Sequence, residues 1–272
     1  LVGSEMCIRD SYILHAYGQP LHCFDADKIK GGKIVVKTVA EGTTFVTLDE
    51  VERKLSDKDL MICNTEEPMC IAGVFGGLDS GTTEQTVDVF LESAYFNPTW
   101  VRKTARRHGL STDSSFRFER GIDPNGTIYA LKEAALLVQE LAGGTISSEI
   151  KDNYPAPIAD FTVELNYEKV HSLIGKTIPV ETIKSIVTSL EMKIVNETPE
   201  GLTLQVPPYR VDVQRDCDVV EDILRIYGYN NVEIPTTLKS SLTTKGEVDY
   251  SQKLQNLISE QLVGCGFNEI LN

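Results

Sequence analysis

The stretch VDVFLESAYFNPTWVRKTARRHG, residues 87–109, contains a predicted strand followed by a predicted helix. Apolar and polar or aromatic positions alternate from Val87 to Glu92, which is the period of a β-strand. Asn97-Pro98 is then a signal that opens a helix, and Gly109 is the expected end of that helix, over Thr99–His108. Because strands precede helices without strict alternation along the chain, the pattern indicates an α+β fold.

The same two patterns extend on both sides of this stretch. Toward the N-terminus, short apolar runs separated by glycine-containing turns predict further strands, at 34–39, 45–48, 60–63 and 70–72. Toward the C-terminus, Asp123-Pro124 is expected to open a helix that runs to Leu141 and stops at Gly143-Gly144. We therefore expect a mixed strand and helix domain over residues 12–152 and a linker over 153–160, where two prolines disfavour helix.

A smaller unit is expected over residues 161–235. Strands are predicted at 161–165 and 202–206, and helices are predicted from Pro179 and from Asp218, each with one apolar stripe. Residues 236–272 are expected to begin a third, truncated domain, with a helix that ends before Gly264 and a strand-like apolar run at 267–271. Residues 1–11 are taken as a leader before the first domain.

The composition restricts the class of protein. No apolar run could span a bilayer and Leu1–Ser11 lacks the apolar run of a signal peptide, so we expect no membrane association and a cytoplasmic location. The six cysteines form no C-x-x-C pair and the four histidines no H-E-x-x-H motif, which gives zinc chemistry little support. An autonomous nucleic-acid binder usually has a basic surface. With a net charge of −14, any RNA contact must be local or come largely from a partner.

An acidic cluster follows Pro207-Pro208. Its five carboxylates are Asp212, Asp216, Asp218, Glu221 and Asp222. A helix would place the last three of them, at i, i+3 and i+4, on one face of its first turn, and hard oxygen ligands of this kind suit Mg²⁺. The alternative is structural, because Asp218 with Glu221 has the spacing of a capping box and acidic residues favour helix N-termini.

The predicted helix at 99–108 is basic. Arg102 and Arg106 share one face, as do Lys103 and Arg107, so this helix could contact RNA phosphates. The alternative is a solvated face whose charges pair with the chain's own carboxylates. Three further features, His22, the Ala72-Gly73 turn and Glu92, each have a plain structural explanation, and no nucleophile–base pair or phosphate-binding loop is visible.

Several longer motifs resemble phenylalanyl-tRNA synthetase β subunits of the bacterial type. Those of the first domain resemble the B3/B4 domain of that family and lie at Gly18–Asp25, Thr47–Asp49, Ile71–Gly77, Leu91–Ala94 and Arg106–Pro124. The stretch that runs from Val206–Asp212 to Arg225–Asn230 is similar to its B5 domain, which is expected to be helical with a few strands. Residues 240–272 are similar to the start of the family's catalytic-like domain.

The resemblance implies part of a phenylalanine–tRNA ligase, which joins phenylalanine to tRNA(Phe) with ATP and Mg²⁺ as an α2β2 tetramer. Synthesis would belong to the α subunit, and the B3/B4 domain would hydrolyse mischarged tyrosyl-tRNA(Phe). Glu92 would accept the tyrosine hydroxyl, with His22, Ala72 and Gly73 around the ester. Residues at the family's Mg²⁺ positions, shared with the α subunit, are Asp212, Asp218, Glu221 and Asp222, and one of these four is Asp where the family usually has Glu.

One departure from the family leaves an alternative open. The leader, residues 1–11, does not resemble the family, and Asp10-Ser11 stand where the family has Thr-Asn, residues that help to form the editing pocket. The chain could instead be a structural module that docks the α subunit and keeps a vestigial pocket.

Overall fold

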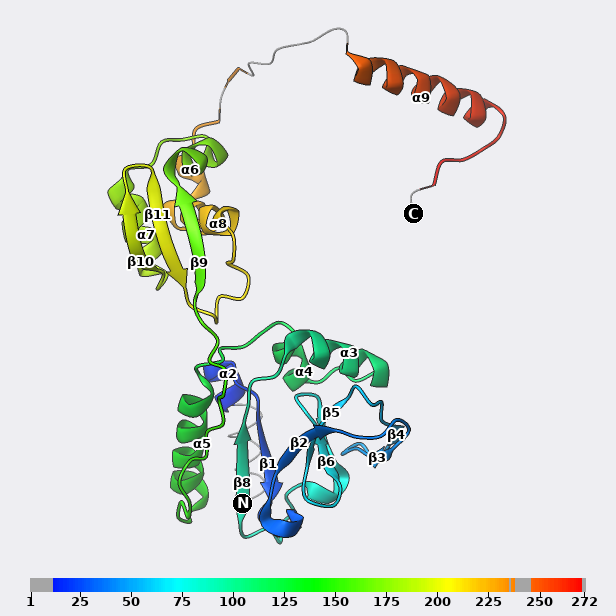
Figure 1. The fold of residues 1–272 in the computed structure, drawn as a ribbon, viewed down its shortest axis with the longest axis vertical. Coiled ribbons are helices and arrows are strands. Elements are labelled where there is room, and N and C mark those ends of the chain that lie inside the picture. Colours follow the sequence, from blue (N-terminus) through cyan, green and yellow to red (C-terminus); the bar gives the residue numbers. More distant parts are fainter. Residues whose placement is uncertain (1–11, 235, 238–245, 271–272) are drawn as a thin grey trace. The chain divides into compact units, whose positions relative to one another are not determined.

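The computed structural model describes residues 12–234, 236–237 and 246–270. The leader predicted over residues 1–11 and most of the junction after residue 234 lie outside these residues. The chain divides into two units, with the boundary in the sequence between Tyr229 and Asn230. Helices and antiparallel strands alternate irregularly within the larger unit, which confirms the α+β class (Figure 1). The domain boundaries within that unit stay predictions.

A two-stranded antiparallel pair joins the beginning of the described chain to the stretch at 87–109. β1 (Leu21–Asp25) pairs with β8 (Val89–Ser93). One face of the pair carries Leu21 and Leu91, which pack against Ala130 and Ala134 of α5 (Thr127–Ala142). The side chains of the opposite face alternate with these and therefore point away from α5.

Four further strands form a second antiparallel sheet in the order β2-β5-β6-β7. Their bounds are Val35–Thr38, Leu60–Cys63, Pro68–Ile71 and Phe75–Gly76. A hairpin of β3 (Thr44–Val46) and β4 (Glu52–Lys54) lies beside this sheet. Met61 and Ile71 of the sheet pack with Phe45 of the hairpin in the largest core. β1 and β4 are strands that the apolar pattern did not predict.

Two helices complete that core. α3 (Pro98–His108) begins after the Asn97 side chain, which accepts the backbone N–H groups of Thr99 and Trp100, and it ends at the left-handed Gly109, as predicted. α4 (Asp113–Phe118), which was not predicted, follows it. Val101 and Ala105 of α3 and Phe118 of α4 are buried in the core. A short helix, α2 (Leu14–Tyr17), precedes β1, and three 3₁₀ turns lie at 26–28, 30–32 and 78–80.

The start predicted for α5 at Asp123-Pro124 is wrong. The Asp123 carboxylate accepts the N–H of Asn125 at 2.9 Å, which closes a local turn, and the helix begins only at Thr127. A side chain that bonds the backbone two residues ahead stabilises a turn as readily as a helix end, so the sequence signal was ambiguous.

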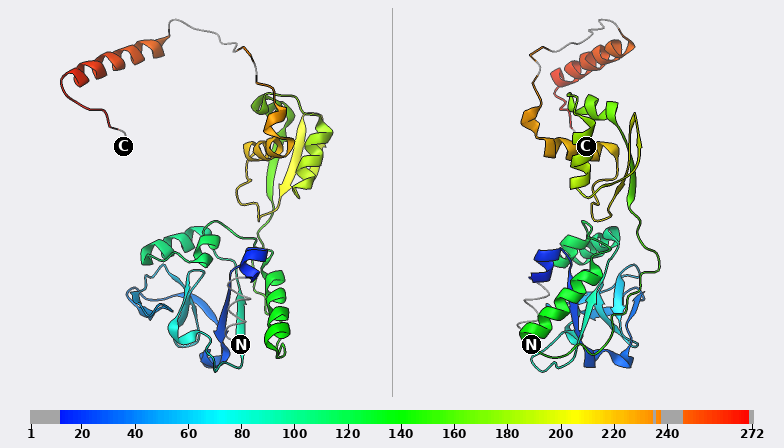
Figure 2. Two further views of the ribbon diagram at one scale, coloured as in Figure 1. Left: turned by 180° about the vertical axis from the view of Figure 1, so that it is seen from behind. Right: turned by 90° about the vertical axis from the view of Figure 1, so that its left-hand side faces the viewer.

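The remaining part of the larger unit is a three-stranded antiparallel sheet in the order β10-β11-β9, with helices on one of its faces (Figure 2). The strands are Lys193–Thr198, Gly201–Val206 and Phe161–Asn166. The helices are α6 (Tyr167–Ile174), α7 (Val180–Ser189) and α8 (Asp216–Tyr227), followed by a short turn at 229–231. Alternate residues of β9 and β11, such as Val163 and Leu204, are buried against the helices. α8 starts two residues before the predicted Asp218.

The second unit contains α9 (Glu247–Gly264), the helix expected before Gly264. The strand-like run predicted at 267–271 forms no strand over residues 267–270, and residue 271 lies outside the described part. Apolar sequence alone does not make a strand, because a strand needs a neighbouring strand for its backbone hydrogen bonds. Among the residues that the structure describes, no helix has the length and apolar character needed to cross a membrane.

Candidate functional site

The pairing of β1 with β8 places His22 directly opposite Glu92. In an antiparallel pair, residues directly opposite each other project from the same face with their Cβ atoms about 5 Å apart. That face is the one turned away from α5, so neither residue belongs to the packed interface with that helix. Strand pairing therefore brings together two of the residues that the resemblance implied.

Both residues line a cavity of about 270 Å³. Further parts of its wall are the turn from Gly73 to Gly76, the first residues of α4 and Leu48 from the β3–β4 hairpin. Most of the lining is apolar and includes Leu14, Leu21, Leu48, Val74, Phe75, Phe96 and Phe118. The cavity thus offers apolar walls together with a few polar groups, which is the usual composition of a small-molecule site.

The cavity contains three of the four predicted pocket residues. His22, Gly73 and Glu92 line it, whereas Ala72 is buried in a neighbouring core with Phe24 and Ile62. Sequence reasoning missed Thr112 and Ser114, which also line the cavity. The available signal was the Thr-x-x-Ser spacing of a helix N-cap, which the structure realises as a capping box between Thr112 and Ser115.

Glu92 is a titratable group of this wall whose acidity is changed by burial. Desolvation in the cavity raises the pKa of its carboxyl from 4.5 to about 7. A carboxyl group with such a pKa is available in both its neutral and ionised forms near neutral pH. It can therefore act as a hydrogen-bond partner for a hydroxyl group of a ligand within otherwise apolar walls.

Gly73 has a structural reason to be glycine. Its φ is +70°, and a Cβ there would lie 2.8 Å from the Phe96 ring and 3.2 Å from Cγ2 of Val101. The hydroxyl of Ser114 donates to the Gly73 carbonyl at 3.3 Å, and that of Thr112 donates to the Val74 carbonyl at 2.7 Å. The turn and the start of α4 therefore hold each other in place at the cavity wall.

We expect Gly73→Ala to destabilise the fold more than Gly109→Ala, its matched control. Both positions have positive φ, which costs an L-residue about 1–2 kcal/mol. Nothing lies within 4 Å of a Cβ at Gly109, whereas Gly73 meets two aromatic rings and Val101, so overpacking adds about 1–3 kcal/mol there. Urea unfolding followed by circular dichroism measures the difference, and equal losses would show that the wall at Gly73 is looser than described.

The acidic cluster is engaged with arginines. One oxygen of the buried Asp222 accepts from Arg210 and the other accepts from Arg225, at 2.9 Å in the second case. Asp218 accepts from the Arg215 side chain at 2.8 Å and from the backbone N–H groups of Gln214 and Arg215. The Arg215 guanidinium, with these backbone bonds, lowers the pKa of Asp218 to about 2.

This arrangement does not fit a metal site within the described chain. Asp212 and Glu221 face solvent while Asp218 and Asp222 are held by arginines, and no group of three or more His, Cys, Asp or Glu among the described residues could hold an ion. Asp218 also occupies the third helical position, where its carboxylate accepts the N-cap N–H. Asp218 therefore caps α8 from its third position, with Arg215 at the N-cap, so the expected capping box of Asp218 with Glu221 is wrong. The Mg²⁺ assignment of Asp212, Asp218, Glu221 and Asp222 stays a prediction.

We expect Asp222→Asn to lower the free energy of unfolding by about 2–4 kcal/mol, because it leaves the largely buried Arg210 without its charged partner. The exposed Asp212→Asn should change it by less than about 0.5 kcal/mol. Urea unfolding by circular dichroism, with and without millimolar Mg²⁺, checks both. Stabilisation of the wild type by Mg²⁺ that disappears in Asp222→Asn would instead show a metal ligand.

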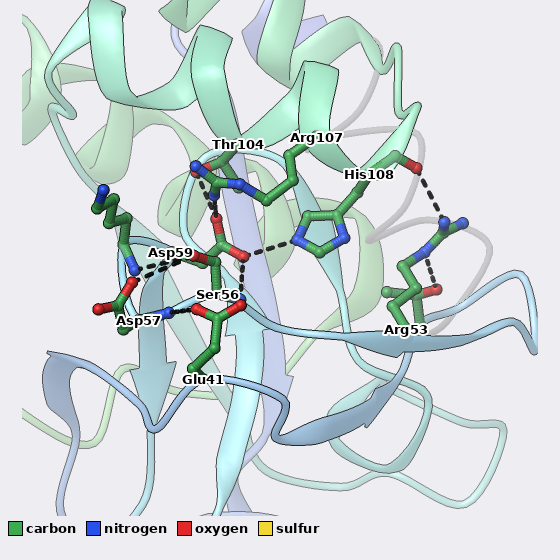
Figure 3. Close-up of polar contacts among 10 residues, drawn as sticks. Glu41, Arg53, Ser56, Asp57, Asp59, Thr104, Arg107 and His108 are labelled. Carbon is green, nitrogen blue, oxygen red and sulfur yellow. Dashed lines mark hydrogen bonds and ion pairs between the residues drawn. The ribbon is translucent and has the colours of Figure 1, made fainter.

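Part of the basic helix α3 pairs with a buried carboxylate of the same chain. Arg107 and His108 point toward the buried Asp59 on the neighbouring strand connection (Figure 3). His108 lies 2.7 Å from one Asp59 oxygen, and the Thr104 hydroxyl donates to the other at 2.9 Å. Desolvation alone would raise the pKa of Asp59, but bonds from the Ser56 N–H, His108 and Thr104 outweigh it and hold that pKa below its usual range. For Arg107, pairing with the chain's own carboxylate is confirmed.

Comparisons with known proteins identify the class first. A B3/4 domain matches residues 11–143, and a tRNA synthetase B5 domain matches residues 163–229. The cavity with His22 and Glu92 falls within the first match. Domains of these two kinds in this order define a part of a tRNA synthetase.

The curated relatives narrow the class to one family. The phenylalanine–tRNA ligase beta subunit of Bacteroides fragilis is 82% identical over 96% of this chain and 32% of its own length. Those of Porphyromonas gingivalis and Geobacter metallireducens are 57% and 41% identical over the same shares of the chains. A solved N-terminal fragment of the Pyrococcus horikoshii beta subunit aligns with a TM-score of 0.41 at 16% identity, over 83% of this chain and 64% of the fragment. The chain belongs to the family of phenylalanine–tRNA ligase beta subunits, and it spans about a third of the length of the curated relatives it matches.

Proposed function

We propose that this chain supplies the proofreading site of a phenylalanine–tRNA ligase, where tyrosine wrongly attached to tRNA(Phe) is removed by hydrolysis. The observation that carries the proposal is the position of Glu92 opposite His22 on one wall of a mainly apolar cavity. A carboxyl group with a raised pKa inside such a cavity can tell a phenol from a phenyl ring, because only the phenol donates a hydrogen bond to it.

A separate hydrolytic site is useful because the synthetic site has limited selectivity. An apolar synthetic pocket for phenylalanine rejects a ligand with one extra hydroxyl only weakly. A site built to bond that hydroxyl instead demands it, and so acts on tyrosine while it spares phenylalanine. The aromatic and aliphatic lining accommodates the ring, and Glu92 accepts the hydroxyl.

The reaction is the hydrolysis of an ester. A water molecule attacks the aminoacyl carbonyl, the bond from that carbonyl to the ribose oxygen breaks, and the ribose oxygen takes up a proton. We assign no side chain as the nucleophile. His22 and the Gly73 turn are placed around the ester by this proposal, with Thr112 and Ser114 holding the turn.

The complete ligase extends beyond this chain. In our proposal it is a cytoplasmic α2β2 assembly, because protein synthesis takes place in the cytoplasm, and it joins phenylalanine to tRNA(Phe) on the α subunit with ATP and Mg²⁺. Asp212 and Glu221 face solvent on the small sheet-and-helix part and are the carboxylates that remain available to a partner.

A second function has one observation in its favour. Asp10-Ser11 replace the Thr-Asn that the resemblance leads us to expect beside the pocket, and these two residues lie outside the described part of the chain. The chain would then serve to dock the α subunit, with a vestigial cavity.

The test separates the two functions. The complete ligase that contains this segment is incubated with tyrosyl-tRNA(Phe) and, separately, with phenylalanyl-tRNA(Phe), and the release of each amino acid is measured. Preferential release of tyrosine supports proofreading. Release of neither amino acid, together with normal assembly with the α subunit, would leave only the docking function.

A further inference from the structure

α3 is a cationic helix in an acidic chain. It contains Arg102, Lys103, Arg106, Arg107 and His108 and no carboxylate. Every other described helix longer than four residues contains at least one Asp or Glu. The chain as a whole has a net charge of −14, so the charge of α3 is opposite to that of its surroundings.

Only part of this charge is neutralised within the chain. Arg107 and His108 are paired with Asp59 (Figure 3). Arg102 and Arg106 are exposed, and no carboxylate of the described residues lies within ion-pair distance of either. Lys103 lies over the Trp100 ring, 4.6 Å from its centroid, and makes no ion pair in the same part of the chain.

These residues form one continuous surface. Val101, Thr104 and Ala105 are buried on the inner side of the helix. At 100° per residue, the positions of Arg102, Lys103 and Arg106 fall on the opposite side, and Trp100 lies at its edge, next to Lys103. Trp100 is 47% exposed, although it is the largest apolar side chain available for burial. We call these four residues the α3 face.

We propose that the α3 face binds RNA, with phosphate groups at Arg102 and Arg106 and an unpaired base against Trp100. This inference rests on the proposed function, because a tRNA ester is the substrate that would bring RNA to this domain. It names a contact for the body of that substrate, separate from the cavity that would hold its amino acid.

Charge complementarity selects the partner. A polyanion is repelled by a chain of net charge −14 except where cations are locally unpaired, and the α3 face meets that condition. Arginine suits phosphate because its planar guanidinium donates two parallel hydrogen bonds. An exposed indole is a stacking surface for any base, and such stacking is a common feature of single-stranded RNA sites.

The inner side of the same helix contacts the cavity wall. A Cβ at Gly73 would lie 3.2 Å from Cγ2 of Val101, and Gly73 lines the cavity. RNA bound on the α3 face would therefore be held on a helix that is itself packed against the proposed hydrolytic site. An acidic protein segment is the competing occupant, and the test distinguishes it.

The experiment measures the affinity of the 272-residue chain for a fluorescently labelled tRNA(Phe) transcript over a range of salt concentrations. The variant is Arg102→Gln with Arg106→Gln. Its matched control is Lys151→Gln with Lys193→Gln, which removes the same charge at two exposed positions elsewhere. Glutamine is a good helix former, so α3 should stay folded, and circular dichroism verifies this.

We expect the variant to bind about tenfold more weakly or worse, with a salt dependence shallower by about one unit for each phosphate that the variant no longer binds. The control should bind as the wild type does. Because Trp100 is the single tryptophan of the chain, its fluorescence should also change when the unlabelled transcript is added.

Unchanged affinity and salt dependence in the variant, or no binding by the wild type at low salt, would overturn the inference. The inference would also be overturned if the variant bound tRNA as the wild type does but no longer captured the α subunit in a pulldown. The α3 face would then bind protein. Failure of the proposed function gives a different result. In that case the complete ligase releases no tyrosine, while the binding difference between the variant and the control persists.

Discussion

The complete ligase with Glu92→Ala is expected to hydrolyse tyrosyl-tRNA(Phe) about 10- to 100-fold more slowly in kcat/KM than the wild type. The substitution removes the group that accepts the phenol hydroxyl, and a hydrogen bond to a charged group contributes about 1.5–3 kcal/mol. Hydrolysis of phenylalanyl-tRNA(Phe) should change little, because its ring donates no such bond. Deacylation assays with both substrates measure the change in discrimination.

The control is Asp88→Ala, which removes an exposed carboxylate immediately before β8. It should leave both rates unchanged. If Glu92→Ala keeps the wild-type preference for tyrosine, Glu92 does not bind the tyrosine hydroxyl, and the cavity has another function.

The pH dependence of the same site follows from the raised pKa of Glu92, about 7. The ionised carboxylate is the stronger acceptor, so the preference for tyrosine should rise between about pH 6 and pH 8 in the wild type and stay flat in Glu92→Gln. The contribution of Glu92 to the free energy of unfolding should instead decrease as pH rises. Since the folded pKa lies above the unfolded value of 4.5, folding binds a proton more tightly, and stability is lost as pH rises between these values.

The second large effect is expected for Asp59→Ala, which should lower the free energy of unfolding by about 3–5 kcal/mol. Asp59 is fully buried, and its removal leaves Thr104, Arg107, His108 and the Ser56 N–H without their shared acceptor. Arg53 donates to the carbonyl of His108 at 3.1 Å, so the same end of α3 is also tied to β4. Urea unfolding followed by Trp100 fluorescence reports on this helix directly.

Asp57→Ala is the matched control for Asp59. It lies in the same turn, is exposed, and should cost less than about 0.5 kcal/mol. Because the pKa of Asp59 is lowered in the folded state, its contribution is present above its unfolded pKa of 3.8 and is lost as pH falls through the folded value. The difference between wild type and Asp59→Ala should therefore shrink in acid. A difference that stays constant in acid would show that the charge of Asp59 is not what stabilises α3.

Local elements with strong end signals and a clear period could be predicted from the residues alone. α3 lies between Asn97 and Gly109 as predicted, and β5 has its predicted bounds, because capping groups and apolar runs act over only a few residues. Motif resemblance further led to His22, Gly73 and Glu92, which the structure places around one cavity.

How these elements pack against one another depends on long-range contacts that the folded chain alone reveals. β1 carries no distinctive strand pattern, and its pairing with β8 is set by long-range contacts that leave no local trace. That register alone placed His22 opposite Glu92 and changed an apparently solvent-facing glutamate into a cavity residue. The same holds for Asp59, whose neighbours in the sequence give no sign of the helix end that it binds, because a buried charge is paired by whatever element packs over it.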